Sequence, residues 1–205
     1  MRNISILDYG IGNLMSLKRA FDYIGKKSKI TSKKKDIMSS SHLILPGVGS
    51  FGNAIKILRD KKLDKIIHDY IKTEKPILGI CLGMQLLFEK SNEFGIHEGL
   101  GFVEGKVQKI SIKKINTPII GWHKINFVNK KDVFLKKNNN SDFYFLHSYQ
   151  CVPSDKKYIL ANYKLNNKNN IVAVIKKKNV YGCQFHPEKS SLQGISFLKE
   201  FLQIT

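Results

Sequence analysis

Cysteine is scarce in this sequence: three of 205 residues, with no paired spacing. This scarcity argues against a disulfide framework and against a zinc site, and it favours a reducing cytoplasm. No apolar run approaches the roughly 20 residues that a membrane-spanning helix needs. The first ten residues lack the pattern of a secretion signal. We therefore expect a cytoplasmic protein with no membrane partner.

Acidic residues are also few: 16 aspartates and glutamates stand against 35 lysines and arginines, which gives a formal net charge of +19. Such an excess is typical of proteins that bind polyanions. Here, however, the lysines form short scattered runs, as in residues 25–36 and 174–179, without the interleaved aromatic residues that stack on bases. We interpret them as solvated surface lysines and expect no nucleic-acid partner.

Short apolar runs alternate with helical patterns in the first half of the chain. "ISILDYG" (4–10), "SHLILPG" (41–47) and "PILGIC" (76–81) read as buried strands, and apolar residues between 14 and 24 recur at helical spacing. From about Gly101 onward the pieces are β-rich and separated by turns, which predicts a mixed or antiparallel extension of the sheet.

These patterns predict a single domain over residues 1–205. At 42% hydrophobic residues, the chain is long and apolar enough for one sizeable core. The expected fold class is α/β: a three-layer sandwich with a central mixed, mostly parallel sheet, covered by helices on both faces.

The pentapeptide "GICLG" (79–83) follows a strand and precedes a helical pattern. Glycines two residues before and after Cys81 match a nucleophile elbow, in which a sharp strand-to-helix turn exposes a reactive side chain. The amide N–H groups of the following helix could then face an oxyanion. The alternative from these five residues is a buried structural cysteine in a tight turn.

A thiolate nucleophile needs a base, and His186 in "YGCQFHPEKS" is the strongest candidate of the six histidines. Strand alternation puts Gln184 and His186 on one face. Glu188, two residues on, can orient the imidazole and stabilise its charged form. We predict a Cys81–His186–Glu188 triad; the alternative for "HPE" is a surface ion pair at a strand end.

Two segments, "GICLGMQLLF" and "QFHPEKS", resemble the signatures of the class I (triad-type) glutamine amidotransferases, which hydrolyse glutamine to glutamate and ammonia. Further segments, "LDYGIGNLMSLKRAF", "LILPGVGSFGNAI", "GWHKI" and "FLHSYQC", stand in the order found in the glutaminase subunits of imidazole glycerol phosphate synthase. The resemblance extends over essentially the whole chain.

The resemblance implies roles for individual residues. Cys81 would attack the side-chain amide of L-glutamine, His186 would transfer protons, and Glu188 would hold His186. The oxyanion would lie against the N–H of Leu82 and an amide around Val48 and Gly49, in a "PGVG" loop that is switchable in the family; the alternative is an ordinary turn. The substrate would be held by Gln85, Ser148 and Tyr149. No cofactor and no metal are implied.

The resemblance also implies a partner, a (β/α)8 cyclase subunit that forms a heterodimer, receives ammonia through a channel and acts in histidine biosynthesis. Trp122 is a candidate contact, with a core position as the alternative. Around it, Ile119 and His123 replace the histidine and asparagine of the pattern "P-H-M-G-W-N". The runner-up is therefore a paralogous glutaminase that supplies ammonia for amination of a bacterial surface sugar. A cysteine peptidase and a basic binding module are weaker alternatives.

Overall fold

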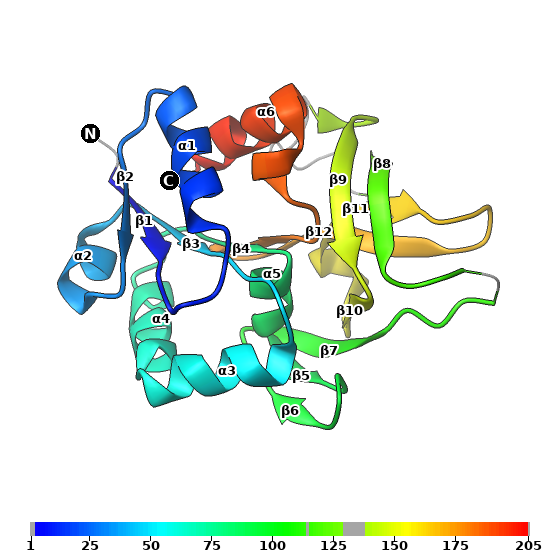
Figure 1. The fold of residues 1–205 in the computed structure, drawn as a ribbon, viewed down its shortest axis with the longest axis horizontal. Coiled ribbons are helices and arrows are strands. Elements are labelled where there is room, and N and C mark those ends of the chain that lie inside the picture. Colours follow the sequence, from blue (N-terminus) through cyan, green and yellow to red (C-terminus); the bar gives the residue numbers. More distant parts are fainter. Residues whose placement is uncertain (1–2, 114, 129–137, 205) are drawn as a thin grey trace.

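A nine-stranded sheet forms the centre of the molecule in a computed structural model that describes residues 3–113, 115–128 and 138–204 (Figure 1). Five neighbouring strands are parallel, in the order β2 (Ser28–Thr31), β1 (Ile4–Leu7), β3 (His42–Leu45), β4 (Ile77–Ile80) and β13 (Val180–Cys183). Four antiparallel strands follow, β12 (Asn170–Lys177), β11 (Ile159–Lys164), β8 (Ile119–Phe127) and β9 (Asp142–His147). The mixed sheet and its antiparallel extension are as the sequence predicted.

Helices cover both faces of the parallel strands, which confirms the three-layer arrangement (Figure 1). One face packs against α1 (Leu14–Tyr23) and α6 (Ser191–Phe201). The other packs against α2 (Lys34–Ser39), α3 (Phe51–Asp60), α4 (Leu63–Ile71) and α5 (Leu82–Leu86). Strands β1, β3, β4 and β13 are buried at every residue, as expected for strands between two helical layers. None of the described helices is long and apolar enough to cross a membrane.

A second sheet of four strands departs from the expectation that all later strands extend the central sheet. It contains β10 (Tyr149–Pro153), β7 (Val103–Lys109), β5 (Phe88–Ser91) and β6 (His97–Glu98). The segment "FYFLHSYQC" leaves the large sheet after β9 and enters the small one at β10. Alternating burial reveals that β7 is a strand with one buried face, but it does not reveal which strand pairs with it.

The carboxyl ends of β1, β3, β4 and β13 meet at one edge of the sheet because these strands are parallel. The chain therefore brings Tyr9, Pro46, Cys81 and His186, each of which follows one of these strands, to a common edge. Open α/β sheets bind their ligands at this edge. Two short 3₁₀ helices, Lys156–Tyr158 and Pro187–Lys189, complete the described elements.

Candidate active site

Cys81 occupies the sharp turn between β4 and α5 with φ +52° and ψ −110°, a conformation that is strained for a residue with a side chain. A Cβ on Gly79 would lie 2.6 Å from the carbonyl oxygen of Gly83, and one on Gly83 would overlap the carbonyl of Leu45. Neither position can hold a side chain, so the two glycines let the turn close. The structure thus has the elbow geometry that the pentapeptide predicts.

His186 and Glu188 lie beside this turn, at the end of β13. The Nδ1 atom of His186 lies 2.9 Å from Oε1 of Glu188, and both side chains are almost fully buried. The backbone N–H of His186 donates to the carbonyl of Tyr144, and the Ser190 hydroxyl donates to the carbonyl of His186. With Nδ1 held by the carboxylate, the other ring nitrogen is left to face Cys81.

Burial lowers the pKa of His186, but a hydrogen bond to Cys81, a second one to Glu188 and the negative charges of both partners outweigh it and raise the pKa from 6.5 to about 10. The imidazole is therefore protonated at neutral pH, which is the state that an ion pair with a Cys81 thiolate requires. A thiolate held in such a pair would be a ready nucleophile.

The Cys81→Ser variant should show a lower His186 pKa than the wild-type protein. Serine removes the negative charge and the sulfur acceptor, while burial continues to favour the neutral ring. A pH titration of the His186 ring signals by NMR measures the change: the imidazolium should persist above pH 8 in the wild type and lose its proton at lower pH in the variant. Equal pKa values in both proteins would contradict the ion pair.

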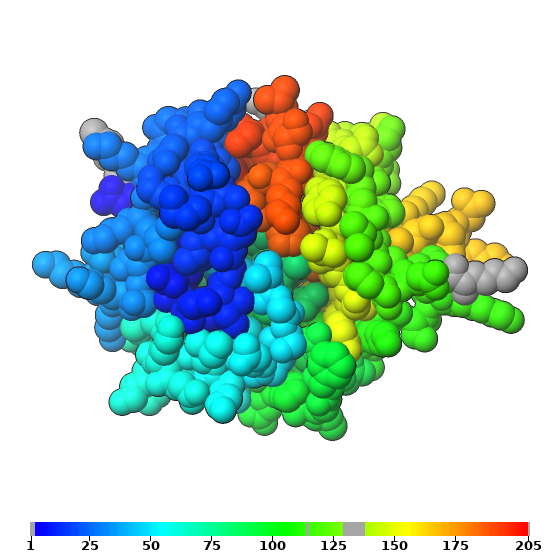
Figure 2. Space-filling model, viewed as in Figure 1, coloured from blue at the N-terminus to red at the C-terminus, as the bar shows by residue number. Residues whose placement is uncertain are grey.

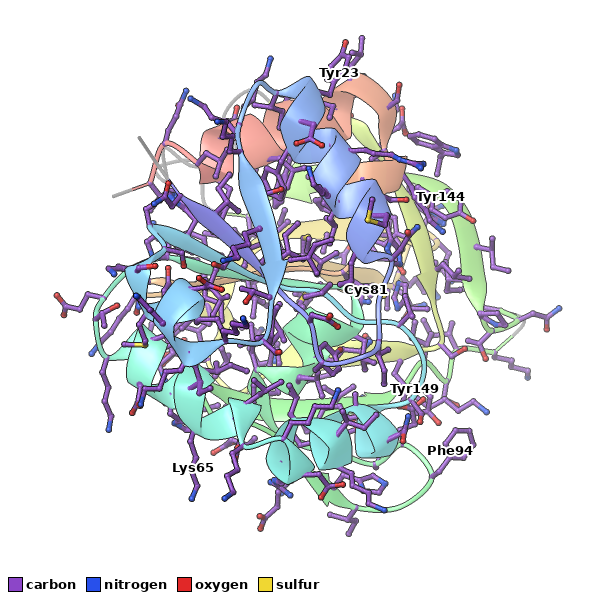
Figure 3. The ribbon with its side chains drawn as sticks, turned by 60° about the vertical axis from the view of Figure 1, so that its left-hand side comes forward. Tyr23, Lys65, Cys81, Phe94, Tyr144 and Tyr149 are labelled. Atoms are coloured by element: carbon purple, nitrogen blue, oxygen red, sulfur yellow. The ribbon has the colours of Figure 1, made fainter. Side chains whose placement is uncertain are left out.

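A cavity of 310 Å³ opens over Cys81. Eight of the residues predicted from the sequence line it: Val48, Gly49, Cys81, Leu82, Gln85, Ser148, Tyr149 and His186. Glu188 lies outside the lining residues, bound to His186, and Trp122 lies outside them on β8. Figure 3 shows Cys81 in the interior, with Tyr149 and Phe94 toward the outer boundary of the molecule.

The residues predicted to bind the oxyanion line the same cavity as the Cys81 sulfur. Leu82 is the first residue of α5, whose first amides have no partner inside the helix. On the other side, the loop after β3 carries Val48, which is 41% exposed, and Gly49, which has φ +90°. Such a φ is accessible to glycine at little cost, so the peptide before it can reorient.

Gln184 is a fully buried residue of the site that the sequence analysis did not single out. Its Nε2 lies 3.6 Å from Sγ of Cys81, and its Oε1 accepts a hydrogen bond from Gln85 at 3.1 Å. The amide of Gln85 also donates to the carbonyl of Tyr149. Strand alternation had already put Gln184 on the same face as His186, so a signal for this residue existed.

Two further ionisable residues line the cavity. Glu93 is 8% exposed, and its carboxylate accepts the N–H of Phe51 at 2.6 Å. No chemical role for this residue was predicted from the sequence. His147 contacts the carbonyl of Tyr149 at 2.7 Å and the hydroxyl of Tyr163 at 2.8 Å, and burial lowers its pKa to about 4. His147 is therefore neutral, with both ring nitrogens engaged, as expected for a locally satisfied histidine.

No group of three or more potential metal-binding side chains lies together in the described part of the chain. Cys81, Cys151 and Cys183 are buried free thiols. The site thus combines the Cys81 sulfur at a sharp strand-to-helix turn, an imidazolium with a supporting carboxylate, and a polar cavity.

Comparison with known proteins assigns the chain to a family. The profile "Glutamine amidotransferase class-I" matches residues 5–204. The imidazole glycerol phosphate synthase subunit HisH of Caldanaerobacter subterraneus subsp. tengcongensis is 46% identical over 203 residues, covering 97% of this chain and 96% of the relative. Subunit HisH 1 of Legionella pneumophila (strain Lens) is 42% identical over 100% of both chains. Subunit HisH of Bacillus subtilis (strain 168) is 39% identical over 98% of this chain and 96% of the relative.

Solved structures agree on the fold. "Structure of PurLQS from Thermotoga maritima" superposes with a TM-score of 0.76 at 19% identity and covers 98% of each chain. "Crystal structure of glutamine amidotransferase" gives a TM-score of 0.74 at 17% identity, covering 98% of this chain and 97% of the other. At these identities the likeness is one of fold alone.

Proposed function

Because this chain belongs to the class I glutamine amidotransferase family, we propose that it is an enzyme that hydrolyses L-glutamine as the glutaminase subunit of an imidazole glycerol phosphate synthase, in histidine biosynthesis. Relatives of that name match over nearly their whole length, which favours this function over the surface-sugar alternative. The observation that carries the chemistry is the buried His186–Glu188 pair beside the elbow cysteine.

The reaction follows from the charges in place before the substrate arrives. The Cys81 thiolate adds to the amide carbon of glutamine, and the resulting oxyanion lies against the Leu82 N–H and an amide of the 46–49 loop. When the C–N bond breaks, His186 gives its proton to the departing ammonia. The neutral imidazole then takes a proton from water, which attacks the thioester, releases glutamate and restores the ion pair.

The cavity also suits the amino-acid end of the substrate. Glu93 supplies a buried negative charge that can face the α-ammonium group. Gln85 donates its amide hydrogens within the protein, which leaves its carbonyl oxygen to accept from the substrate. Ser148 and Tyr149, where the chain crosses between the two sheets, border the same cavity and can bind the α-carboxylate.

The cyclase subunit would dock on an exposed apolar patch of β8 and β9, formed by Ile120, Trp122, Tyr144 and Leu146. Ile120 pairs with Leu146 and Trp122 with Tyr144 across the two strands. Ile120 is 60% exposed and Trp122 51%, so the core alternative for Trp122 does not hold. Figure 2 shows these strands, in yellow and green, next to the orange segment that connects β13 to α6.

One of the two strands that carry the patch, β9, contacts Cys81 and His186 through its backbone. The carbonyl of Tyr144 accepts the N–H of His186, and the carbonyl of Leu146 lies 3.8 Å from Sγ of Cys81. A partner seated on β9 would therefore be one strand away from the point of ammonia release. Such proximity suits a sheltered channel, because ammonia that escapes into neutral water is protonated and loses its nucleophilicity.

The departures at Ile119 and His123 do not alter this patch. Ile119 is buried, and the ring of His123 packs against Phe145 and Tyr163 at 5.7 and 4.9 Å between ring centroids. Successive strand residues face opposite sides, so these two positions point inward while Ile120 and Trp122 point outward. The substitutions that kept the sugar pathway open thus lie on the inward face of β8, with Ile119 buried and His123 half-buried.

Trp122→Ala should weaken binding of the cyclase subunit about 10- to 100-fold, because exposed tryptophans often act as interface anchors. Isothermal titration calorimetry of the purified subunits measures the dissociation constant. Ile96→Ala is a matched control, since Ile96 is 85% exposed but lies beside the small sheet. Equal binding by the wild-type protein and Trp122→Ala would remove this residue from the interface.

The function is tested by glutamate release from L-glutamine, measured for the protein alone, with the cyclase subunit, and with the cyclase subunit plus its ribulosyl nucleotide ligand. We expect strong stimulation by the partner and its ligand. Cys81-dependent activity that does not respond to this partner would support glutaminase activity with a surface sugar as the ammonia acceptor. Absence of glutamate release under all three conditions would refute the proposed function.

A further inference from the structure

Tyr9 is a fully buried tyrosine that follows β1 and reaches the start of the oxyanion loop. Its hydroxyl donates a hydrogen bond to the carbonyl of Pro46 at 2.9 Å. Pro46 is the first residue of the 46–49 segment that carries Val48 and Gly49. A buried carbonyl that loses a hydrogen-bond donor is costly, so this bond restrains where the segment begins.

The loop around Tyr9 makes a second contact with the same proline. A Cβ built on Gly12 would lie 3.3 Å from Cβ of Pro46, so the backbone of Gly12 packs against the proline ring. Lys61, at the end of α3, donates from Nζ to the carbonyl of Tyr9 at 3.0 Å and holds the loop from its other side. Figure 1 shows this loop between β1 and α1 passing beside the segment that leads from β3 to α3.

The next residue, Gly47, fits closely between Tyr9 and the elbow. A Cβ on Gly47 would lie 2.8 Å from the backbone nitrogen of Gly83, 2.9 Å from Cβ of Leu82 and 2.9 Å from the hydroxyl of Tyr9. The Pro46 carbonyl and the Gly47 N–H belong to one planar peptide, so a bond to the first fixes the direction of the second. Beyond Gly47 the chain is held less, since Val48 is exposed and Gly49 has φ +90°.

We propose that Tyr9 is a positioning residue for glutamine hydrolysis: its hydroxyl fixes the Pro46–Gly47 peptide and so sets where the amides at Val48 and Gly49 can meet the oxyanion. This inference rests on the proposed glutaminase function. Burial raises the pKa of Tyr9, and a negative charge at Cys81 raises it further, so the hydroxyl keeps the proton that it donates. Tyr9 acts through the loop and does not itself touch the substrate.

The Tyr9→Phe variant, assayed in the complex with the cyclase subunit, should lower kcat for L-glutamine about 10- to 30-fold and change KM less than twofold. Complete loss of an oxyanion donor costs about 100- to 1,000-fold in kcat, and a displaced donor costs part of that. The amino-acid end of the substrate, which determines KM, binds elsewhere in the cavity, so KM should change little. The phenylalanine ring keeps the packing of Tyr9 and removes only the hydroxyl.

Tyr70→Phe is a closely matched control. Tyr70 is also fully buried, and its hydroxyl also donates to a proline carbonyl, that of Pro76 at 3.4 Å, at the opposite end of the parallel strands. We expect both variants to lower Tm by similar amounts, with kcat of Tyr70→Phe within twofold of the wild type. A similar fall in kcat in both variants would mean that Tyr9 acts through general stability, and would overturn the proposal.

The rate of Cys81 alkylation by iodoacetamide distinguishes an effect of Tyr9 on the oxyanion loop from an effect on the nucleophile. The thiolate displaces iodide from a saturated carbon, and no oxyanion forms, so Tyr9→Phe should react within twofold of the wild-type rate. Alkylation that slows in step with kcat would show that Tyr9 acts on the thiolate, and an unchanged kcat would show no role; either result overturns the inference alone. A wild-type complex that releases no glutamate would instead overturn the proposed function and this inference with it.

Discussion

The Cys81→Ala variant should release glutamate from L-glutamine at least about a thousandfold more slowly than the wild-type protein, because no other group in the cavity can form the thioester. Cys81 is 7% exposed, and its side chain is small. Loss of one buried sulfur should cost about 1 kcal/mol of unfolding free energy. Binding of the cyclase subunit should be nearly unchanged. Steady-state assays with the cyclase subunit, the Tm and the dissociation constant of the complex check these three expectations.

Cys151→Ala is the matched control for this experiment. It removes the same atom from a fully buried free cysteine in β10, outside the residues that line the cavity. We expect a similar loss of stability and near-normal glutaminase activity. Normal glutamine hydrolysis by Cys81→Ala would refute the proposed triad, whatever the effect of the substitution on stability.

The His186→Gln variant should lower kcat by about a millionfold, since removal of the histidine base of a nucleophile–base–acid triad has an effect of this size. Glutamine can still hydrogen-bond to Glu188, but it carries no proton that can be transferred and no positive charge to hold a thiolate. The rate of Cys81 alkylation by iodoacetamide at neutral pH should therefore fall as well. Steady-state kinetics and the alkylation rate together measure the loss of both roles.

His68→Gln provides the comparison for His186. His68 is an exposed histidine on α4, and its ring packs against Phe102. Its substitution should leave kcat and the alkylation rate within twofold of the wild type. A His186→Gln enzyme that kept more than a tenth of the wild-type kcat would require another base, and His147, which also lines the cavity, would be the candidate.

The parts of the site that lie in short motifs could be predicted from the sequence. A nucleophile elbow needs small residues at fixed offsets from Cys81, and an acid that orients His186 can lie two residues away at Glu188. Such constraints act within one turn of the chain, so they leave a local pattern. For the same reason, the eight cavity residues that were predicted all lie in segments that follow a strand or begin a helix.

Other parts of the site come together only in three dimensions. No role for Glu93 or Tyr9 was predicted from the sequence. Tyr9 reaches the site because parallel strands bring their carboxyl ends to one edge, and Glu93 reaches it from the loop that follows β5 of the second sheet. The second sheet was not predicted because period-two burial identifies a strand such as β7 without naming its partner. The inward direction of Ile119 and His123, by contrast, could have been inferred from alternation with Trp122.

The most direct test of the central claim uses a glutamine analogue that carries a diazoketone in place of the amide. Once the diazo carbon has taken a proton from the His186 imidazolium, the Cys81 sulfur would displace dinitrogen from that carbon and form a stable thioether. We predict one adduct per chain, on the peptide that contains Cys81, with loss of glutaminase activity in proportion and protection by L-glutamine. Labelling of another residue, or full glutaminase activity after complete labelling of Cys81, would contradict the account.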